Sequence, residues 1–190
     1  MKNLRYLIVL LFALPFLSCD TQIIDVVDEF KFEQGGYMRI VTPFPVVNAT
    51  FSVSKANLAG TKLELVHEAV TPNKGANFAT YDLVIKFEDK TGANGNKSTT
   101  DKALRSIAAS EYKADATTGY PRHTFTVTGT DAVSKCGLVG DDIAKGDWFT
   151  ISGTMVLTDG KKFNAANTGV NITGGAFYSS PFLYRINVVD

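Results

Sequence analysis

Apolar and polar residues alternate with a period of two through most of the chain from Gly35 onward, and this pattern constrains the fold more than any other feature. The clearest run covers residues 81–88. Its apolar members are Tyr81, Leu83, Ile85 and Phe87, and charged residues take three of the four intervening positions. Because successive side chains of a β-strand point to opposite faces, the run predicts a strand with one buried face.

Similar runs bring the expected number of strands to about seven. They lie at residues 37–41, 51–53, 63–69, 125–127, 149–157 and 182–188, with Gly, Pro, Asn and Asp between them. Helical spacing is scarce: residues 100–112 favour one short helix and residues 130–137 a second. The chain is therefore predicted to be all-β, an antiparallel β-sandwich, immunoglobulin-like in general architecture, with one or two short helical connectors. A jelly roll or a partly closed barrel is the alternative closure.

The first 18 residues have the pattern of an export signal. Lys2 and Arg5 are followed by an apolar run over residues 7–14, which is shorter than the roughly 20 residues of a membrane-spanning helix. Without this leader the chain has 17 basic and 19 acidic residues, a net charge of −2, which argues against binding to nucleic acid. The full sequence has 45% hydrophobic and 20% charged residues, within the range of globular proteins, and a chain of this length is expected to fold without disulfides.

The leader ends in Ser18-Cys19, which resembles a bacterial lipobox, where a cysteine thiol is acylated before cleavage on its N-terminal side. Phe16 and Leu17 depart from the usual lipobox residues. We expect a lipid anchor on Cys19, and the alternative is ordinary secretion with Cys19 free or paired with Cys136. If Cys19 is acylated, Cys136 is the one thiol left and is expected to be a small core residue near a helix end. Residues 19–34 are expected to form an acidic tether or edge strand, and residues 35–190 a single β-sandwich domain.

Several turn-and-strand motifs resemble those of small Bacteroidota lipoproteins found beside starch-utilisation-type (Sus-like) nutrient uptake systems. The motifs are Gly35-Gly36-Tyr37-Met38-Arg39, Tyr120-Pro121-Arg122, Gly146-Asp147-Trp148-Phe149, residues 157–163 and Ser180-Pro181-Phe182. The resemblance implies an outer-membrane lipoprotein with a β-sandwich domain that helps to capture or deliver a nutrient. It supplies no functional residue.

Trp148 is the most informative candidate for ligand binding. Alternation turns its neighbours Phe149 and Ile151 inward, so Trp148 is expected on the polar face with Thr150 and Ser152. An exposed indole beside hydroxyl groups suits the apolar face and the hydroxyls of a sugar. The alternative is that Trp148 lies under a covering loop. Phe177 and Tyr178, which follow two glycines, either project toward the same ligand or pack over one end of the sandwich.

Charged side chains offer two further hypotheses. Arg39, Arg122 and Arg185 could each bind a carboxylate from a peptide or a uronic acid, or could shield strand edges. Asp141, Asp142 and Asp147 could hold calcium through oxygen ligands, although their spacing matches no calcium loop. The two histidines, His67 and His123, are expected to be structural, and no other cofactor is expected.

No pair of facing carboxylates and no nucleophile beside a base is visible, so we expect no enzyme. The predicted function is that of a lipid-anchored accessory protein of the outer membrane. It would bind a glycan or a peptide, or assist an outer-membrane transporter complex. The alternative is a structural, adhesion or assembly component of the envelope without a small-molecule ligand.

Overall fold

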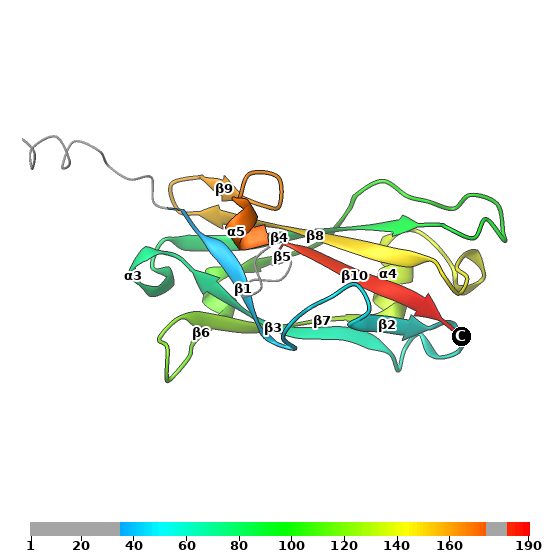
Figure 1. The fold of residues 1–190 in the computed structure, drawn as a ribbon, viewed down its shortest axis with the longest axis horizontal. Coiled ribbons are helices and arrows are strands. Elements are labelled where there is room, and N and C mark those ends of the chain that lie inside the picture. The colour runs from blue at the N-terminus through cyan, green and yellow to red at the C-terminus, as the bar shows by residue number, and fades with distance from the viewer. Residues whose placement is uncertain (1–34, 174–181) are drawn as a thin grey trace, which may run out of the picture. The chain divides into compact units, whose positions relative to one another are not determined.

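Two β-sheets pack face to face in the computed structural model, which describes residues 35–173 and 182–190 (Figure 1). The first, here called the β3 sheet, has four strands. In spatial order they are β1 (Tyr37–Thr42), β3 (Lys62–Val70), β7 (Pro121–Thr128) and β6 (Lys113–Ala114). All its pairings are antiparallel.

The second sheet, here called the β8 sheet, has six strands. In spatial order they are β2 (Phe51–Ser54), β10 (Leu183–Val189), β8 (Trp148–Leu157), β4 (Phe78–Glu88) and β5 (Lys102–Ala108), with β9 (Lys162–Phe163) paired to β8. Its pairings are antiparallel except that β2 runs parallel to β10. The chain thus moves from the β3 sheet to the β8 sheet between β1 and β2.

The strand order is that of an immunoglobulin-like sandwich. If β1, β3, β4, β5, β6, β7, β8 and β10 take the letters A, B, C, C′, D, E, F and G, the sheets read ABED and GFCC′. The additional strand β2 lies beside G. The prediction of an all-β sandwich is confirmed, and every run of alternating residues on which it rested lies in a strand, except that Phe182 directly precedes β10.

The core lies between the inward faces of the two sheets, and its most specific contact joins two tyrosines. Tyr81 of β4 and Tyr184 of β10 are fully buried, and their hydroxyl groups lie 2.9 Å apart. The strand between them, β8, carries Gly153 on its inward face. A Cβ atom at that position would lie 2.0 Å from the Tyr81 hydroxyl oxygen, so the bond between the tyrosines requires a residue without a side chain there.

The helical segments of the described residues are all short. They are η2 (Lys55–Asn57), α3 (Pro72–Gly75), η3 (Ala109–Glu111), α4 (Gly129–Lys135), η4 (Gly140–Asp142) and α5 (Val170–Thr173). The helix expected at residues 130–137 is confirmed as α4. Thr128 and Asp131 cap its start reciprocally, since each side chain accepts a hydrogen bond from the other residue's backbone N–H. Cys136 follows α4 and is buried, as expected of a core thiol.

The helix expected within residues 100–112 was wrong. Residues 102–108 form strand β5, and only the single turn η3 follows. The physical reason is the neighbouring strand: β4 offers a free edge, and pairing of Thr80–Ile85 with β5 satisfies backbone groups that a helix would have satisfied internally. The pairing register shifts at a bulge between Leu83 and Val84. The shift allows Leu104 and Ile107, which are three positions apart, to belong to one strand although they do not follow a period of two.

Candidate ligand-binding site

The candidate site lies on the outer face of the β8 sheet, along its central strand β8. Phe149 and Ile151 of this strand are fully buried, whereas Trp148, Thr150 and Ser152 are half-buried on the opposite face. The alternation predicted from the sequence is therefore confirmed. Because β8 is hydrogen-bonded to β4 and β10 on its two sides, the backbone under the site is held rigidly.

The register places particular side chains beside each other on this face. Asn187 of β10 and Glu88 of β4 lie on either side of Trp148. One step along the strands, Arg185 of β10 and Lys86 of β4 lie on either side of Thr150. The face near Trp148 is therefore rich in charge.

Two cations lie against the indole ring of Trp148. The guanidinium carbon of Arg185 is 3.6 Å from the ring centroid, and the ammonium nitrogen of Lys90 is 4.6 Å from it. Both distances are within the range of cation–π attraction. The ring is thus already stacked against a guanidinium, and it is not the open stacking platform that the sequence suggested. Whether Trp148, Thr150 and Ser152 bind a ligand remains a prediction.

Hydrogen bonds fix the orientation of Arg185. Its Nε donates to the side-chain oxygen of Asn187 at 2.7 Å. The amide nitrogen of Asn187 in turn donates to the backbone carbonyls of Asn48, at 2.6 Å, and Phe51, at 3.2 Å. The parallel pairing of β2 with β10 brings these carbonyls to Asn187, so the guanidinium is positioned by residues more than 130 positions away in the chain.

Two depressions adjoin along the outer face of β8. The first has a volume of about 260 Å³ and is lined by Asn48, Trp148, Thr150, Leu183, Tyr184 and Arg185. The second has a volume of about 300 Å³, and its lining includes Ser152, Thr154, Asn164 and Leu183. Leu183 lines both and is 43% exposed. Of the predicted ligand-binding residues, Trp148 and Thr150 therefore lie in the first depression and Ser152 in the second.

One carboxylate lies among the cations of this face. Glu88 accepts a hydrogen bond from Thr150 at 2.9 Å and lies 3.4 Å from Lys86 and 3.2 Å from Lys90. Burial opposes its charged form, but the hydrogen bonds from Thr150 and Lys90 and the charge of Lys86 outweigh it and lower the pKa of Glu88 to about 2. Glu88 is therefore charged at any physiological pH.

The three aspartates proposed as calcium ligands are engaged separately. Asp147 is buried, and its carboxylate accepts hydrogen bonds from the backbone N–H groups of Lys90, Thr91 and Ala144. It therefore anchors the loop that places Lys90 against Trp148.

Asp142 accepts from the N–H of Val139 and pairs with Lys97 at 3.0 Å. Asp141 is bonded through its backbone carbonyl to Asn94. Within residues 35–173 and 182–190, no group of three or more His, Cys, Asp or Glu side chains is arranged to hold a metal ion. The calcium hypothesis thus gains no support from these aspartates, because the carboxylates of Asp142 and Asp147 bind loop backbone and a lysine, and Asp141 is held through its backbone carbonyl.

The other predicted site residues lie outside the described part of the chain. These are Phe177 and Tyr178, proposed as ligand-binding residues, and the lipidation site Cys19. The leader and the expected tether, residues 1–34, lie outside it as well.

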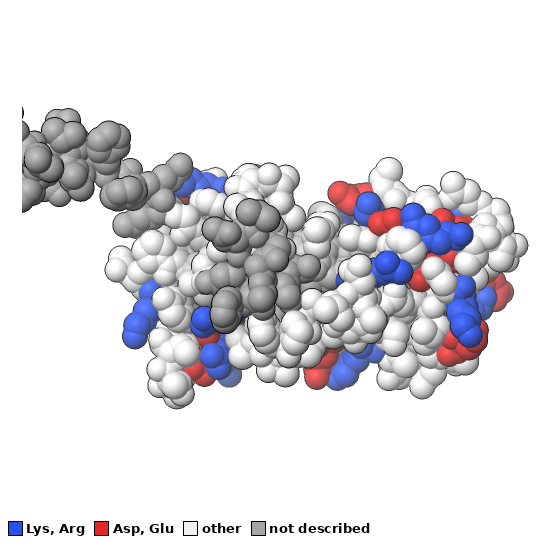
Figure 2. Space-filling view, viewed as in Figure 1, with Lys and Arg blue, Asp and Glu red and all other residues white. Residues whose placement is uncertain are grey.

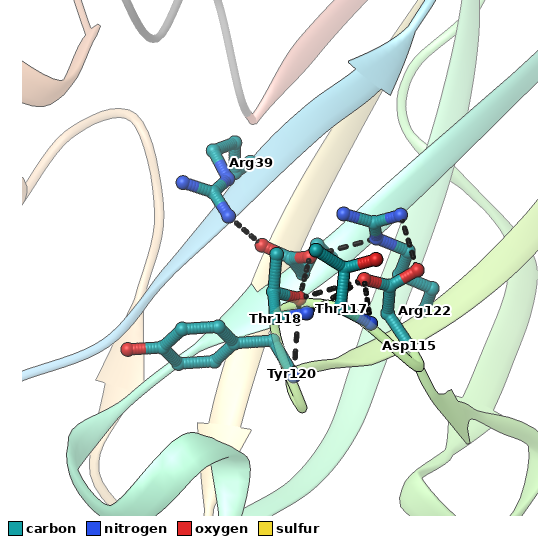
Figure 3. A network of polar contacts seen from close by, with 7 residues as sticks. Arg39, Asp115, Thr117, Thr118, Tyr120 and Arg122 are labelled. Atoms are coloured by element: carbon teal, nitrogen blue, oxygen red, sulfur yellow. Dashed lines mark hydrogen bonds and ion pairs between the residues drawn. The ribbon is translucent and has the colours of Figure 1, made fainter.

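The outer face of the β3 sheet carries a second cluster of charges, centred on Glu68. Its side chain has no exposed surface, and it is bound by Arg39 of β1 and by the Nε of Arg122 of β7 at 2.7 Å (Figure 3). Thr118 donates a third hydrogen bond, at 3.1 Å. Arg39 and Arg122 are the residues directly opposite Glu68 on the neighbouring strands.

The loop before β7 closes over this cluster. Asp115 pairs with Arg122 at 2.6 Å and accepts hydrogen bonds from the backbone N–H groups of Thr117 and Thr118 (Figure 3). The ring of Tyr120 lies beside Arg39, 6.0 Å from its guanidinium carbon to the ring centroid. The sequence suggested that Arg39 and Arg122 bind the carboxylate of a ligand. In the structure both bind the carboxylate of Glu68 in the same chain.

A buried histidine lies on the inward face of β3, the strand that carries Glu68. The Nε2 of His67 is 2.6 Å from the hydroxyl oxygen of Tyr112, and its ring stacks on that of His123, 5.7 Å away between centroids. Burial, together with the charges of His123 and Arg105, lowers the pKa of His67 to about 3. His67 is therefore neutral in the folded protein at physiological pH, as a structural core residue should be.

Sequence reasoning missed the partners of Trp148 and Arg185, namely Lys90, Asn187 and Asn48. The signal that could have found Asn187 is its spacing of two from Arg185, which places both side chains on one face of a strand. Asn48 and Lys90 lie in loops, so only the pairing of distant strands brings them to the site.

A scan against models of known protein families found no match, and neither did a search of curated proteins. Among the described residues, no helix combines the length and the apolar character needed to cross a membrane. Basic and acidic side chains are interspersed on the face drawn in Figure 2 and form no extended patch of one sign. A proposal of function therefore depends on the residues of the site itself.

Proposed function

We propose that this chain is a lipid-anchored accessory protein of a bacterial outer membrane that binds a nutrient ligand on the outer face of the β8 sheet, without catalysing a reaction. The observation that carries the binding proposal is the pair of adjoining depressions along β8, lined by hydroxyl, amide and guanidinium groups beside a single tryptophan. A few convergent polar groups on a rigid element are typical of a site that recognises a small polar ligand.

The anchor and the location rest on the sequence. A basic and apolar leader ends at Ser18-Cys19, and several acyl chains on Cys19 would hold the protein on a membrane essentially permanently. The resemblance to lipoproteins beside nutrient uptake systems supports a partnership with an outer-membrane transporter. A ligand bound at the membrane surface would then be close to the protein that imports it.

Affinity electrophoresis with immobilised neutral and acidic glycans tests the binding proposal, and titration with short peptides tests the peptide alternative. We expect at least one glycan to retard the wild-type protein and Arg185→Ala to be retarded less. Palmitate labelling of cells that express the full chain tests the anchor, and we expect Cys19→Ala to abolish it. Labelling that persists in Cys19→Ala would overturn the anchor without affecting the binding site.

A second candidate function is protein docking in an envelope assembly. It is favoured by exposed apolar side chains on neighbouring segments: Phe44 and Val47 precede β2, and Leu183 and Val189 lie on β10, the strand with which β2 pairs. Exposed apolar groups that lie together mark protein interfaces. Co-purification with a transporter that is lost in Phe44→Ser/Val47→Ser, combined with no retardation by any glycan, would favour docking over ligand binding.

A further inference from the structure

The arginines of the described residues differ in one respect. Arg39, Arg105 and Arg122 each pair with a carboxylate, on Glu68, Glu111 or Asp115. Arg185 has no acidic partner within residues 35–173 and 182–190; its Nε donates to the neutral amide of Asn187. A guanidinium that is half-buried and positioned, yet unpaired with an acid, is a ready-made site for a carboxylate from outside.

The groups around Arg185 occupy its Nε and one face of the guanidinium, but not its two terminal nitrogens. Asn187 occupies Nε, and the ring of Trp148 covers one face of the guanidinium plane. The two terminal nitrogens therefore remain for a ligand, and together they match the two oxygens of a carboxylate. Because the Asn48 and Phe51 carbonyls fix Asn187, little side-chain entropy is lost when a ligand binds.

The local charge also favours an anion. Arg185, Lys86 and Lys90 contribute three positive charges around Trp148 and Thr150, and Glu88 contributes one negative charge. The carboxylate of Glu88 already forms ion pairs with both lysines and accepts a hydrogen bond from Thr150. An incoming anion thus meets a net positive charge although the chain as a whole carries none.

We propose that the depression beside Trp148 binds the carboxylate of an acidic oligosaccharide, a glycan that contains uronic acid, through the terminal nitrogens of Arg185. The inference rests on the proposed function and names its ligand class. Sugar hydroxyls find partners in Thr150 and Asn48 of the same depression and in Ser152 and Asn164 of the next. The exposed side chain of Leu183 between the depressions offers an apolar contact to the face of a sugar ring.

A peptide fits this site less well. Extended peptides bind sheets by adding a strand at an edge, whereas β8 is already paired on both sides. Leu183 is the one large apolar side chain of the lining that is exposed, and Val84, Ala165 and Ala166 add only small apolar groups beside it. In this arrangement Trp148 is a positioning residue, because it stacks on Arg185 and holds the guanidinium in place rather than stacking on the sugar.

Titration of the full folded chain with trigalacturonic acid tests the inference, with its fully methyl-esterified form as the neutral control. Trp148 is the one tryptophan of the chain, so its fluorescence reports on this site, and calorimetry gives the dissociation constant independently. We expect the acid to bind about 10- to 100-fold more tightly than the ester, the range for charge-assisted hydrogen bonds. Arg185→Gln should abolish this preference, and Arg185→Lys should keep part of it.

Three further variants separate the roles. Trp148→Ala should weaken binding of the acid, whereas Trp148→Phe should restore most of it, because a phenyl ring can still stack on the guanidinium. Arg105→Gln, which removes an arginine on the same sheet that has its own carboxylate partner, should leave the preference unchanged.

Equal binding of acid and ester, or a preference that survives in Arg185→Gln, would overturn the inference. Tighter binding of an acetylated tripeptide with a free carboxyl terminus, compared with its amide and with trigalacturonic acid, would overturn the choice of a glycan. If neutral glycans retard the protein while no acid binds, the inference fails and the proposed function stands. If no glycan of either kind binds, both fail.

Discussion

Arginines on the two outer faces of the sandwich have opposite surroundings: those on one face pair with acidic side chains, and the one on the other face does not. On the β3 sheet, Arg39 and Arg122 lie on either side of Glu68, and a loop closes over the cluster until Glu68 has no exposed surface. On the β8 sheet, Arg185 lies opposite Thr150, and no described acid pairs with it. The same residue type in the same kind of strand position is thus internally satisfied on one face and open on the other.

The difference shows how a sheet face can serve stability or binding with similar residues. An arginine with an internal carboxylate contributes to folding and has little left for a ligand. An arginine held only by a neutral amide and an aromatic ring keeps its charge-assisted hydrogen bonds for a partner.

Glu68→Ala should have the largest effect, because it leaves Arg39 and Arg122 facing each other without a counter-charge. Loss of one member of a buried ionic cluster costs about 3 kcal/mol, at the lower end here because both arginines are partly exposed. Urea unfolding measures the change. Glu64→Ala on the same strand, whose side chain is 47% exposed, is the matched control and should change stability by less than about 0.5 kcal/mol.

Truncating one arginine on each face compares the faces directly. Arg122→Ala removes one of the groups that bind Glu68 and should cost about 2 kcal/mol. Arg185→Ala removes a cation–π contact and one partly exposed hydrogen bond to a neutral amide, and should cost at most about 1 kcal/mol. Thermal unfolding of the two variants in parallel measures both. A cost for Arg185→Ala as large as that for Arg122→Ala would break the contrast.

Acid should weaken the β3 sheet before it changes the charges of the β8 face. The folded-state pKa of His67, about 3, lies below the unfolded value near 6.5, so the unfolded chain binds a proton more readily below pH 6.5. Stability is therefore lost as pH falls from about 6.5 toward 3, by about 2 kcal/mol at pH 5.

Urea unfolding at pH 7 and pH 5 measures this loss, and His67→Leu should reduce it. Over the same range Glu88 stays ionised, because its pKa is about 2, so the charge around Trp148 should not change. A variant His67→Leu that loses as much stability as the wild type would assign the acid sensitivity to other groups.

Thr150→Glu copies the arrangement of Glu68 onto the open face. Thr150 lies directly opposite Arg185, as Glu68 lies directly opposite Arg122. Stability should fall by about 1 kcal/mol, because the partly exposed new pair with Arg185 is offset by the lost hydrogen bond from Thr150 to Glu88 and by the repulsion between the two carboxylates. Binding of an acidic glycan should be lost because Arg185 gains an internal partner. Thr124→Glu, at an exposed position of β7 in the other sheet, is the control and should retain binding.

The sequence alone was sufficient for the elements whose signal is local. Period-two alternation predicted the inward faces of β4, β7 and β8. A start at Thr130 or Asp131 and a stop at Gly137 predicted α4, although the cap proved to be Thr128. It failed at residues 102–108, because pairing with the free edge of β4 overrides the helical spacing of that segment. The sequence alone could not show that the Glu68 side chain is buried, because Glu68 lies on the polar side of its strand. The loop that covers it comes from residues about 50 positions later.

For the candidate site, alternation found Trp148, Thr150 and Ser152 but not the groups that determine their chemistry. Lys90 reaches Trp148 because Asp147 binds the backbone of its loop, and Arg185 is oriented by Asn187. These relations depend on strand register and loop closure, which a single sequence does not encode in any local pattern. An open sugar platform was therefore the natural expectation, and a guanidinium held on an indole replaces it.

Gly153 has a consequence for how sequences of this kind can diverge. The space that its missing side chain leaves is filled by the Tyr81 hydroxyl and ring, with atoms 2.0–2.6 Å from where a Cβ would be. Positions 81 and 153 are therefore expected to vary together in descendants of this chain, with alanine or serine at 153 found only beside a smaller residue at 81. A smaller residue at 81 would also remove the hydrogen bond between the two tyrosine hydroxyl groups.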